Sequence, residues 1–127
     1  MVVLDSPQGA RGDSASARDT AARYLAQHCP WADLDAVLLV VSELVTNAVR
    51  HTSGWWRLRL RAGQGKLVVE MDDSSPERPV AREPDFAGGG GFGWHMVHRL
   101  ASTVEVRMLP EGKQVRATWL RPVESAC

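Results

Sequence analysis

Three polar residues that can do chemistry recur at intervals of four along residues 42–52. They are Glu43, Asn47 and His51, and apolar residues fill most of the positions between them. A carboxylate and an imidazole can exchange protons, and an amide can both donate and accept hydrogen bonds. Side chains four residues apart share one helix face. The stretch therefore predicts a helix whose polar stripe either holds a ligand, with a nucleotide as the first hypothesis, or is covered by solvent.

A second candidate is Asp73, which ends the alternating segment Lys66–Asp73. Leu67, Val69 and Met71 fall on the same face as Asp73, so its carboxylate points to the apolar side of the predicted strand and needs a partner there. An aspartate after a strand is usually a turn former or a helix cap. Asp73 by itself would therefore not indicate a site.

The third feature is a long segment, residues 74–92, that contains three prolines and four consecutive glycines at 88–91 and shows no periodicity. Loops of this length are uncommon in compact domains and usually have a function. A short helix is predicted to begin at Gly93, and free amides at a helix N-terminus bind phosphate well. A glycine cluster is more often just a flexible loop, but the three features together favour a pocket.

Hydrophobic periodicity predicts the elements that must position these residues. The predicted helices run from Ser14 or Ser16 to about His28, over Leu34–His51 with Asp33 as the cap, and over residues 93–102. The predicted strands cover residues 2–4, 55–62, Lys66–Asp73, 104–109 and 113–120.

The strands share a pattern of one apolar and one charged face. The outer positions carry charges that can pair across strands, namely Arg57, Arg59, Glu70, Glu105, Arg107 and Arg116. Short turns between consecutive strands favour antiparallel pairing, and a sheet with one solvated face must be covered on the other. The sequence predicts an α/β fold, a two-layer α/β sandwich with a mixed, mostly antiparallel sheet covered on one face by three helices.

Composition limits the function classes. The 127 residues make a single domain, and 15 basic against 15 acidic residues give no reason to expect nucleic acid or an anionic membrane as a partner. The two cysteines, Cys29 and Cys127, have no ligand-like spacing and favour a reduced cytosolic protein. The N-terminal apolar run stops at Leu4, so neither a signal peptide nor a membrane span is expected.

Three motifs resemble those of a known superfamily. Glu43-Leu-Val-Thr-Asn-Ala-Val-Arg-His51 resembles the N box of the gyrase, histidine-kinase and heat-shock-chaperone ATPases (the Bergerat fold). Residues 69–76 resemble their first glycine box and residues 89–97 their second, in the same order and at matching spacing. The resemblance covers about residues 14–122, between an N-terminal segment, 1–13, and a tail, 123–127. Within the superfamily, the chain is most similar to the bacterial anti-sigma-factor serine/threonine kinases.

The resemblance implies roles for the residues of the N box. Asn47 would coordinate Mg²⁺ through its side-chain oxygen, with Glu43 also placed in the second shell of the ion. Glu43 would act as the general base on a hydroxyl nucleophile. Arg50 and His51 would assist on the phosphate side, although a histidine at a helix C-terminus is equally well explained by the helix dipole.

Roles for the other two boxes are also implied. Asp73 would accept a hydrogen bond from the adenine amino group, and the backbone at Gly91 and Gly93 would approach the phosphates. Residues 74–92 would form the lid over ATP. The family's first glycine box usually reads Asp-x-Gly-x-Gly, whereas neither glycine is present here. Ser75 and Pro76 would form the turn instead, with Ser75 among the nucleotide-binding residues. Gln114 would stand near the adenine, where the family often has a threonine.

The resemblance also implies the biochemical setting. ATP and Mg²⁺ would be the cofactors, a sigma factor and a small antagonist protein the partners, and the bacterial cytoplasm the location, with a homodimer left open. The main alternative is a regulatory module that binds nucleotide weakly or not at all and acts by protein contact. A detached histidine-kinase catalytic domain is disfavoured, because no dimerisation helix with a phosphoacceptor histidine is expected before the domain and His28 is too close to serve.

Overall fold

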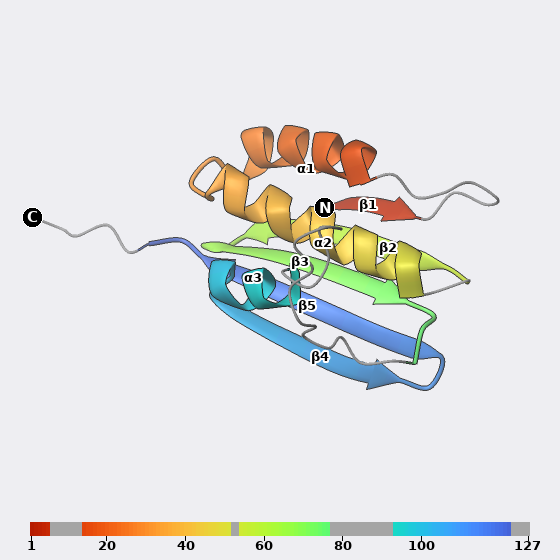
Figure 1. The fold of residues 1–127 in the computed structure, drawn as a ribbon. Helices are drawn as coiled ribbons and strands as arrows, with labels where there is room; N and C mark the ends of the chain where they lie inside the picture. The colour runs from red at the N-terminus through yellow and green to blue at the C-terminus, as the bar shows by residue number, and fades with distance from the viewer. Residues whose placement is uncertain (6–13, 52–53, 77–92, 123–127) are drawn as a thin grey trace, which may run out of the picture.

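The computed structural model describes residues 1–5, 14–51, 54–76 and 93–122 of the chain, which form two layers, a sheet and a layer of helices over one of its faces (Figure 1). The helices are α1 (Ser14–His28), α2 (Leu34–His51) and α3 (Gly93–Leu100). The strands are β1 (Val2–Asp5), β2 (Trp56–Gly63), β3 (Lys66–Asp73), β4 (Thr103–Leu109) and β5 (Gly112–Leu120). The two-layer α/β sandwich predicted from the sequence is confirmed.

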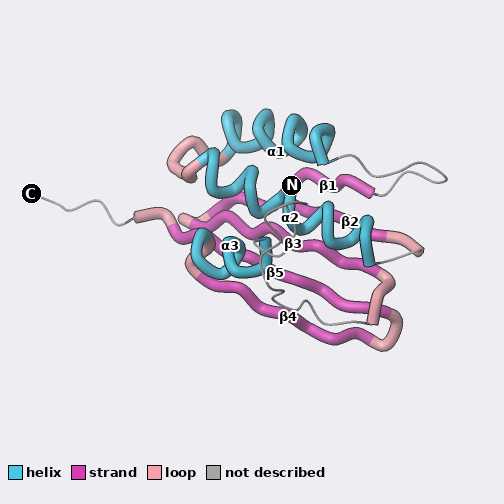
Figure 2. The backbone as a smooth tube through the Cα atoms, in the orientation of Figure 1, coloured by secondary structure: helices cyan, strands magenta, loops and turns pink. Residues whose placement is uncertain are grey.

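The strands form one five-stranded sheet in the order β1-β2-β3-β5-β4, as the tube in Figure 2 shows. Each of the four pairs is antiparallel, so the described sheet is not mixed as expected but antiparallel throughout. The chain passes from β3 through α3 and β4 before it forms β5. In the sheet, however, β5 lies between β3 and β4, so β1 and β4 are the two edge strands.

The long helix α2 forms as the periodicity predicts. The side chain of Asp33 accepts a hydrogen bond from the backbone amide of Ala36 at 3.2 Å, which caps the helix N-terminus. Its apolar stripe, from Val37 to Ala48, is almost completely buried against the sheet. The helix α1 is tied to β2 by Tyr24, whose hydroxyl accepts a hydrogen bond from the amide of Ala62 at 3.0 Å.

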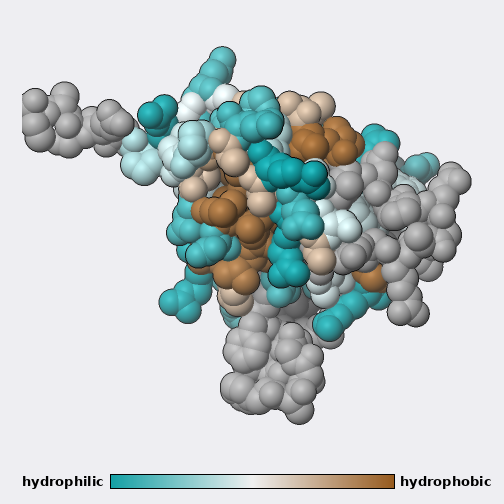
Figure 3. All heavy atoms as spheres, turned by 90° about the horizontal axis from the view of Figure 1, so that it is seen from above, coloured by the Kyte–Doolittle hydropathy of each residue, from teal (hydrophilic) through white to brown (hydrophobic). Residues whose placement is uncertain are grey.

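The core lies between the helices and the sheet. It is lined by alternate residues of the three central strands, namely Trp56, Leu58, Leu60, Leu67, Val69, Met71, Val115, Ala117 and Trp119. The indole nitrogen of Trp119 donates to the carbonyl of Leu100 at 2.9 Å. The helix α3 ends there, two residues earlier than expected, because the amide of Ser102 already donates to Thr118 on β5. In the view onto the helix layer (Figure 3), apolar side chains gather in patches that polar side chains border. The exposed large apolar residues of α2 are Leu34, Leu39 and Val49.

Candidate functional site

The C-terminal end of α2 and the C-terminal end of β3 lie at the same end of the molecule (Figure 1). The segment that enters β2 after α2 is bonded to the turn that follows β3. The amide of Ser74 donates to the carbonyl of Trp55 at 3.0 Å, and the amide of Trp55 donates to the hydroxyl of Ser74 at 3.2 Å. In the sheet, Trp56 pairs with Asp73, which pairs in turn with Lys113 at the start of β5.

The polar stripe of α2 borders this end of the core. Glu43 and Asn47 are half-buried, next to the fully buried Leu44 and Ala48. Arg50 is exposed, and His51 is the last residue of the helix; its side chain lies outside the described part of the structure. The two residues with implied catalytic and metal-binding roles therefore lie neither deep in the core nor fully in solvent.

Asp73 is buried on the helix-covered face, with 3% of its surface exposed. Its Oδ1 atom accepts two hydrogen bonds, one from the backbone amide of Ser75 at 2.8 Å and one from the ammonium group of Lys113 at 3.0 Å. Lys113 is itself buried, with 6% exposed. The partner that a carboxylate on the apolar side requires is therefore Lys113.

The bond from Ser75 also explains how the turn forms without the two glycines of the usual motif. An aspartate that accepts a hydrogen bond from the amide two residues later closes an Asx turn. Ser75 is buried at this turn, so the structure brings it to Asp73 as the sequence suggested. Gly112 permits the next contact, because a Cβ atom at its φ of +155° would meet the carbonyl oxygen of Asp73 at 1.9 Å.

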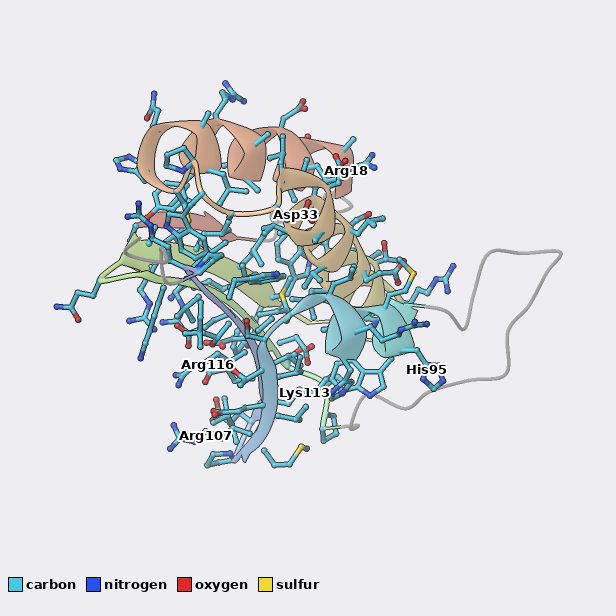
Figure 4. The ribbon with its side chains drawn as sticks, turned by 90° about the vertical axis from the view of Figure 1, so that its left-hand side faces the viewer. Arg18, Asp33, His95, Arg107, Lys113 and Arg116 are labelled. Carbon is cyan, nitrogen blue, oxygen red and sulfur yellow. The ribbon has the colours of Figure 1, made fainter. Side chains whose placement is uncertain are left out.

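Gln114 lies on the opposite face of the sheet. It pairs with Asp72 in the ladder between β3 and β5 and follows the alternation that puts Lys113 and Val115 on the covered face. In Figure 4 the sheet is seen nearly edge-on, with Lys113 on the side of α3 and Arg116 on the other side. The residue beside Asp73 is thus Lys113, which the sequence reasoning missed, and not Gln114.

The remaining site residues belong to the second glycine box. Gly93 is the first residue of α3, and α3 packs against α2, the helix that carries the polar stripe. Gly91 and most of the predicted lid, residues 77–92, lie outside the described residues.

A second group of charges lies on the open face of the sheet and is centred on Glu70. The guanidinium groups of Arg61, Arg116 and Arg59 approach its carboxylate at 2.5, 3.2 and 3.7 Å. Arg59 also contacts Asp72 at 2.9 Å. Burial raises the pKa of Glu70, but the hydrogen bonds from Arg116 and Arg61 outweigh it, so the pKa lies below the ordinary value. The cross-strand pairing predicted for this face is confirmed at Glu70.

The described residues contain no group of three or more His, Cys, Asp or Glu side chains that could hold a metal ion. Mg²⁺ does not require such a group, because it keeps water and phosphate oxygens among its ligands and often takes only one or two from the protein. The amide oxygen of Asn47 and the carboxylate of Glu43 are oxygen donors one helical turn apart on α2. The residues present therefore fit this ion.

The comparisons with known proteins agree with this arrangement. The family model described as the histidine kinase-like ATPase domain matches residues 10–119. The chain belongs to this family. As an ATPase domain of this family it is a nucleotide-binding domain of the kinase-like type, with ATP as the implied nucleotide.

Several solved structures share the fold of this ATPase domain. The histidine kinase domain of the blue-light activated histidine kinase EL346 from Erythrobacter litoralis is 26% identical, with a TM-score of 0.54 over 69% of this chain and 44% of that one. The RsbU and RsbW domains of Rv1364c from Mycobacterium tuberculosis match over 100% of this chain and 35% of that one, with 19% identity and a TM-score of 0.62. The histidine kinase domain of the E. coli osmosensor EnvZ is 20% identical, with a TM-score of 0.52 over 76% and 70% of the two chains.

The ATPase domain spans less than half the length of the first two of these proteins. No curated protein matches it. None of the helices in the described ranges has the length and hydrophobicity needed to cross a bilayer.

Proposed function

We propose that this ATPase domain is a Mg²⁺-dependent serine/threonine protein kinase of the anti-sigma-factor type, which phosphorylates a small antagonist protein and binds a sigma factor in the bacterial cytoplasm. The observation that carries the proposal is the position of Asp73. Its carboxylate is buried on the helix-covered face, at the end of the molecule where the polar stripe of α2 also ends. The sequence of the N box resembles that of the anti-sigma-factor kinases, and this resemblance supports the assignment to the anti-sigma-factor type.

The nucleotide would be held from three elements. Asp73 on β3 accepts a hydrogen bond from the adenine amino group, and the backbone amide at Gly93 on α3 faces the phosphates with the favourable end of the helix dipole. Arg50 and His51 at the end of α2 add positive charge and hydrogen-bond donors near the phosphates. Gly91 would extend the amide cradle at the lid.

The chemical step would be served by α2. The side-chain oxygen of Asn47 is the protein ligand for Mg²⁺, which when bound neutralises charge on the phosphates. Glu43, one turn earlier on the helix, orients the seryl or threonyl hydroxyl of the antagonist and accepts its proton. Half-burial of Glu43 suits this role, because the carboxylate remains reachable for a protein substrate while part of its surface is shielded from water.

Nucleotide binding is tested by calorimetric titration of the full chain with ATP, in the presence and absence of Mg²⁺. We expect Asp73→Asn to abolish measurable binding under both conditions and Asn47→Ala to remove the gain in affinity that Mg²⁺ provides. Asp72→Asn is the matched control, since Asp72 is the neighbouring carboxylate on the open face and pairs with Arg59. Unchanged affinity in both site variants would refute the site assignment.

Phosphoryl transfer is tested with labelled ATP and a candidate antagonist protein as the phosphate acceptor. We expect Glu43→Gln to reduce the rate by about a hundred-fold or more, as for removal of a general base, and to leave ATP affinity almost unchanged. Asp35→Asn makes the same chemical change in the first turn of the same helix and should transfer phosphate at the wild-type rate.

A specific observation favours one second candidate, a regulatory module that binds nucleotide or partner proteins without kinase activity. The turn after Asp73 lacks both glycines of the usual motif, and the carboxylate is already paired with Lys113. Such a module would bind the sigma factor equally well with and without ATP and would transfer no label. Transfer that depends on Glu43 excludes it.

A further inference from the structure

The buried pair of Asp73 and Lys113 has a defined hydrogen-bonding pattern. Both bonds that Asp73 accepts from the described residues, from the amide of Ser75 and from the ammonium of Lys113, end on Oδ1. A carboxylate oxygen has two acceptor sites, so Oδ1 is fully used. None of the hydrogen bonds among the described residues ends on Oδ2. The acceptor available to a base amino group is therefore Oδ2.

The ammonium group of Lys113 has capacity left in the same place. It carries three N–H donors and no acceptor, and its bond to Asp73 uses one of them. Lys113 points to the same face of the sheet as Asp73, from the neighbouring strand and at the same register position. The pair thus presents an acceptor, Oδ2, beside a charged donor, Nζ. In Figure 4, Lys113 lies on the side of the sheet where α3 packs.

An ion pair with only a structural role would be energetically unfavourable at this position, because both charges lose their contact with water. Both side chains are almost fully buried, at 4% and 7% side-chain exposure, and a buried ion pair adds little or nothing to stability compared with apolar residues of similar size. The strands β3 and β5 are already joined by an uninterrupted antiparallel ladder from Lys66 to Asp73. The pair is better explained by recognition of a ligand that needs both of its groups.

We propose that Lys113 is a base-reading residue that works together with Asp73. The edge of adenine carries an amino donor flanked by ring nitrogen acceptors, so the amino group bonds to Oδ2 while one ring nitrogen accepts a hydrogen bond from Nζ. The inference rests on the proposed nucleotide site and adds to it a second contact to the base. It also assigns to Lys113 the place beside the adenine that the family resemblance implies for Gln114.

The test is calorimetric titration of the full chain with ATP, 1-deaza-ATP and 7-deaza-ATP. ATP has both ring acceptors beside the amino group, 1-deaza-ATP lacks N1 and 7-deaza-ATP lacks N7. In the wild-type protein, one of the two analogues should bind about ten- to a hundred-fold more weakly than ATP, as for loss of a hydrogen bond to a charged donor. Lys113→Met keeps the length of the side chain and removes the donor, so it should bind all three nucleotides alike. The control Lys66→Met, at the exposed far end of β3, should discriminate as the wild type does.

The comparison between nucleotides distinguishes base reading from a structural role. If Lys113 only supported the strand ends, Lys113→Met would weaken ATP and both analogues by the same factor, and that result would overturn the inference. Equal binding of the three nucleotides by the wild type would overturn it as well, while leaving the proposed function intact. A wild-type chain that binds none of them would overturn both.

Lys113→Met leaves the carboxylate of Asp73 without its counter-charge, so a second variant guards against loss of the fold. Lys113→Gln keeps a neutral donor, and thermal unfolding verifies that it is folded at the temperature of the titration. It should discriminate between ATP and the sensitive analogue less strongly than the wild type, because a neutral donor makes a weaker bond. Discrimination equal to that of the wild type would contradict the role of the ammonium group.

Discussion

Replacement of Glu70 by glutamine removes one buried charge and almost no volume. The carboxylate accepts hydrogen bonds from Arg61 at 2.5 Å and Arg116 at 3.2 Å, and its side chain is 4% exposed. The two bonds end on Oε1 and Oε2, and glutamine keeps only one acceptor oxygen. One bond therefore loses the charge of its acceptor and the other is lost, which costs about 1–3 kcal/mol in all. The two guanidinium side chains are 51% and 38% exposed, so solvent screening reduces this figure. We expect Glu70→Gln to lower the free energy of unfolding by about 1–2 kcal/mol and Tm by about 3–8 °C.

The dependence of this effect on pH has a definite sign. The fold lowers the pKa of Glu70 from the ordinary value of 4.5, so the native state favours the charged form more than the unfolded state does. The stabilisation is therefore complete above the unfolded-state pKa and is lost as the pH falls through the lower folded-state pKa. The difference in Tm between the wild type and Glu70→Gln should narrow as the pH falls below about 4.5.

The assay is thermal unfolding followed by circular dichroism, from neutral to acid pH and at low and high salt. High salt should also narrow the difference, because the arginines are partly exposed. The control is Glu105→Gln, which removes an exposed carboxylate on β4. Its Tm should equal that of the wild type. Identical Tm values for Glu70→Gln and the wild type at neutral pH and low salt, or a difference that stays constant into acid, would refute the reasoning.

Three further predictions concern single positions. Gly112→Ala should lower the free energy of unfolding by about 2 kcal/mol or more in a denaturant titration, because the new Cβ meets the carbonyl of Asp73; wild-type stability would contradict the close approach. Tyr24→Phe should cost about 1–2 kcal/mol by leaving the amide of Ala62 without its acceptor, and an unchanged midpoint would show that water replaces the hydroxyl. Gln114→Ala should leave ATP affinity unchanged in calorimetry, since Gln114 lies on the open face; a marked loss would return it to the site.

The parts of the fold that local periodicity determines could be predicted from the sequence. The helix α2 begins at Leu34 and ends at His51 as expected, because its apolar stripe is long and Asp33 caps it. The alternation in β3 correctly placed Asp73 on the covered face with a need for a partner. Both conclusions depend only on residues close together in the chain.

The partner of Asp73 could not be found in the same way. It is set by the register between β3 and β5, which joins Asp73 to Lys113 across 40 residues, and nothing near either residue specifies that register. A signal was nevertheless present. Lys113 has the same parity as Val115, Ala117 and Trp119, which are core residues, so alternation alone puts Lys113 inside and Gln114 outside. The family motif implied Gln114 as the residue near the adenine, whereas the register pairs Gln114 with Asp72 and Lys113 with Asp73.

The two buried carboxylates of β3 show how one strand separates stability from recognition. Glu70 and Asp73 are three residues apart, so they point to opposite faces. On the open face three arginines surround Glu70, whereas on the covered face a single lysine balances Asp73. Because the second pair is neutral, it can bind the polar edge of a base without repelling the negative phosphates. In the proposed function, the charge of the triphosphate would be met elsewhere in the site, by Mg²⁺ at Asn47, by Arg50 and by the amides that open α3. Affinity for the phosphates should accordingly depend on Mg²⁺, while selection of the base should not.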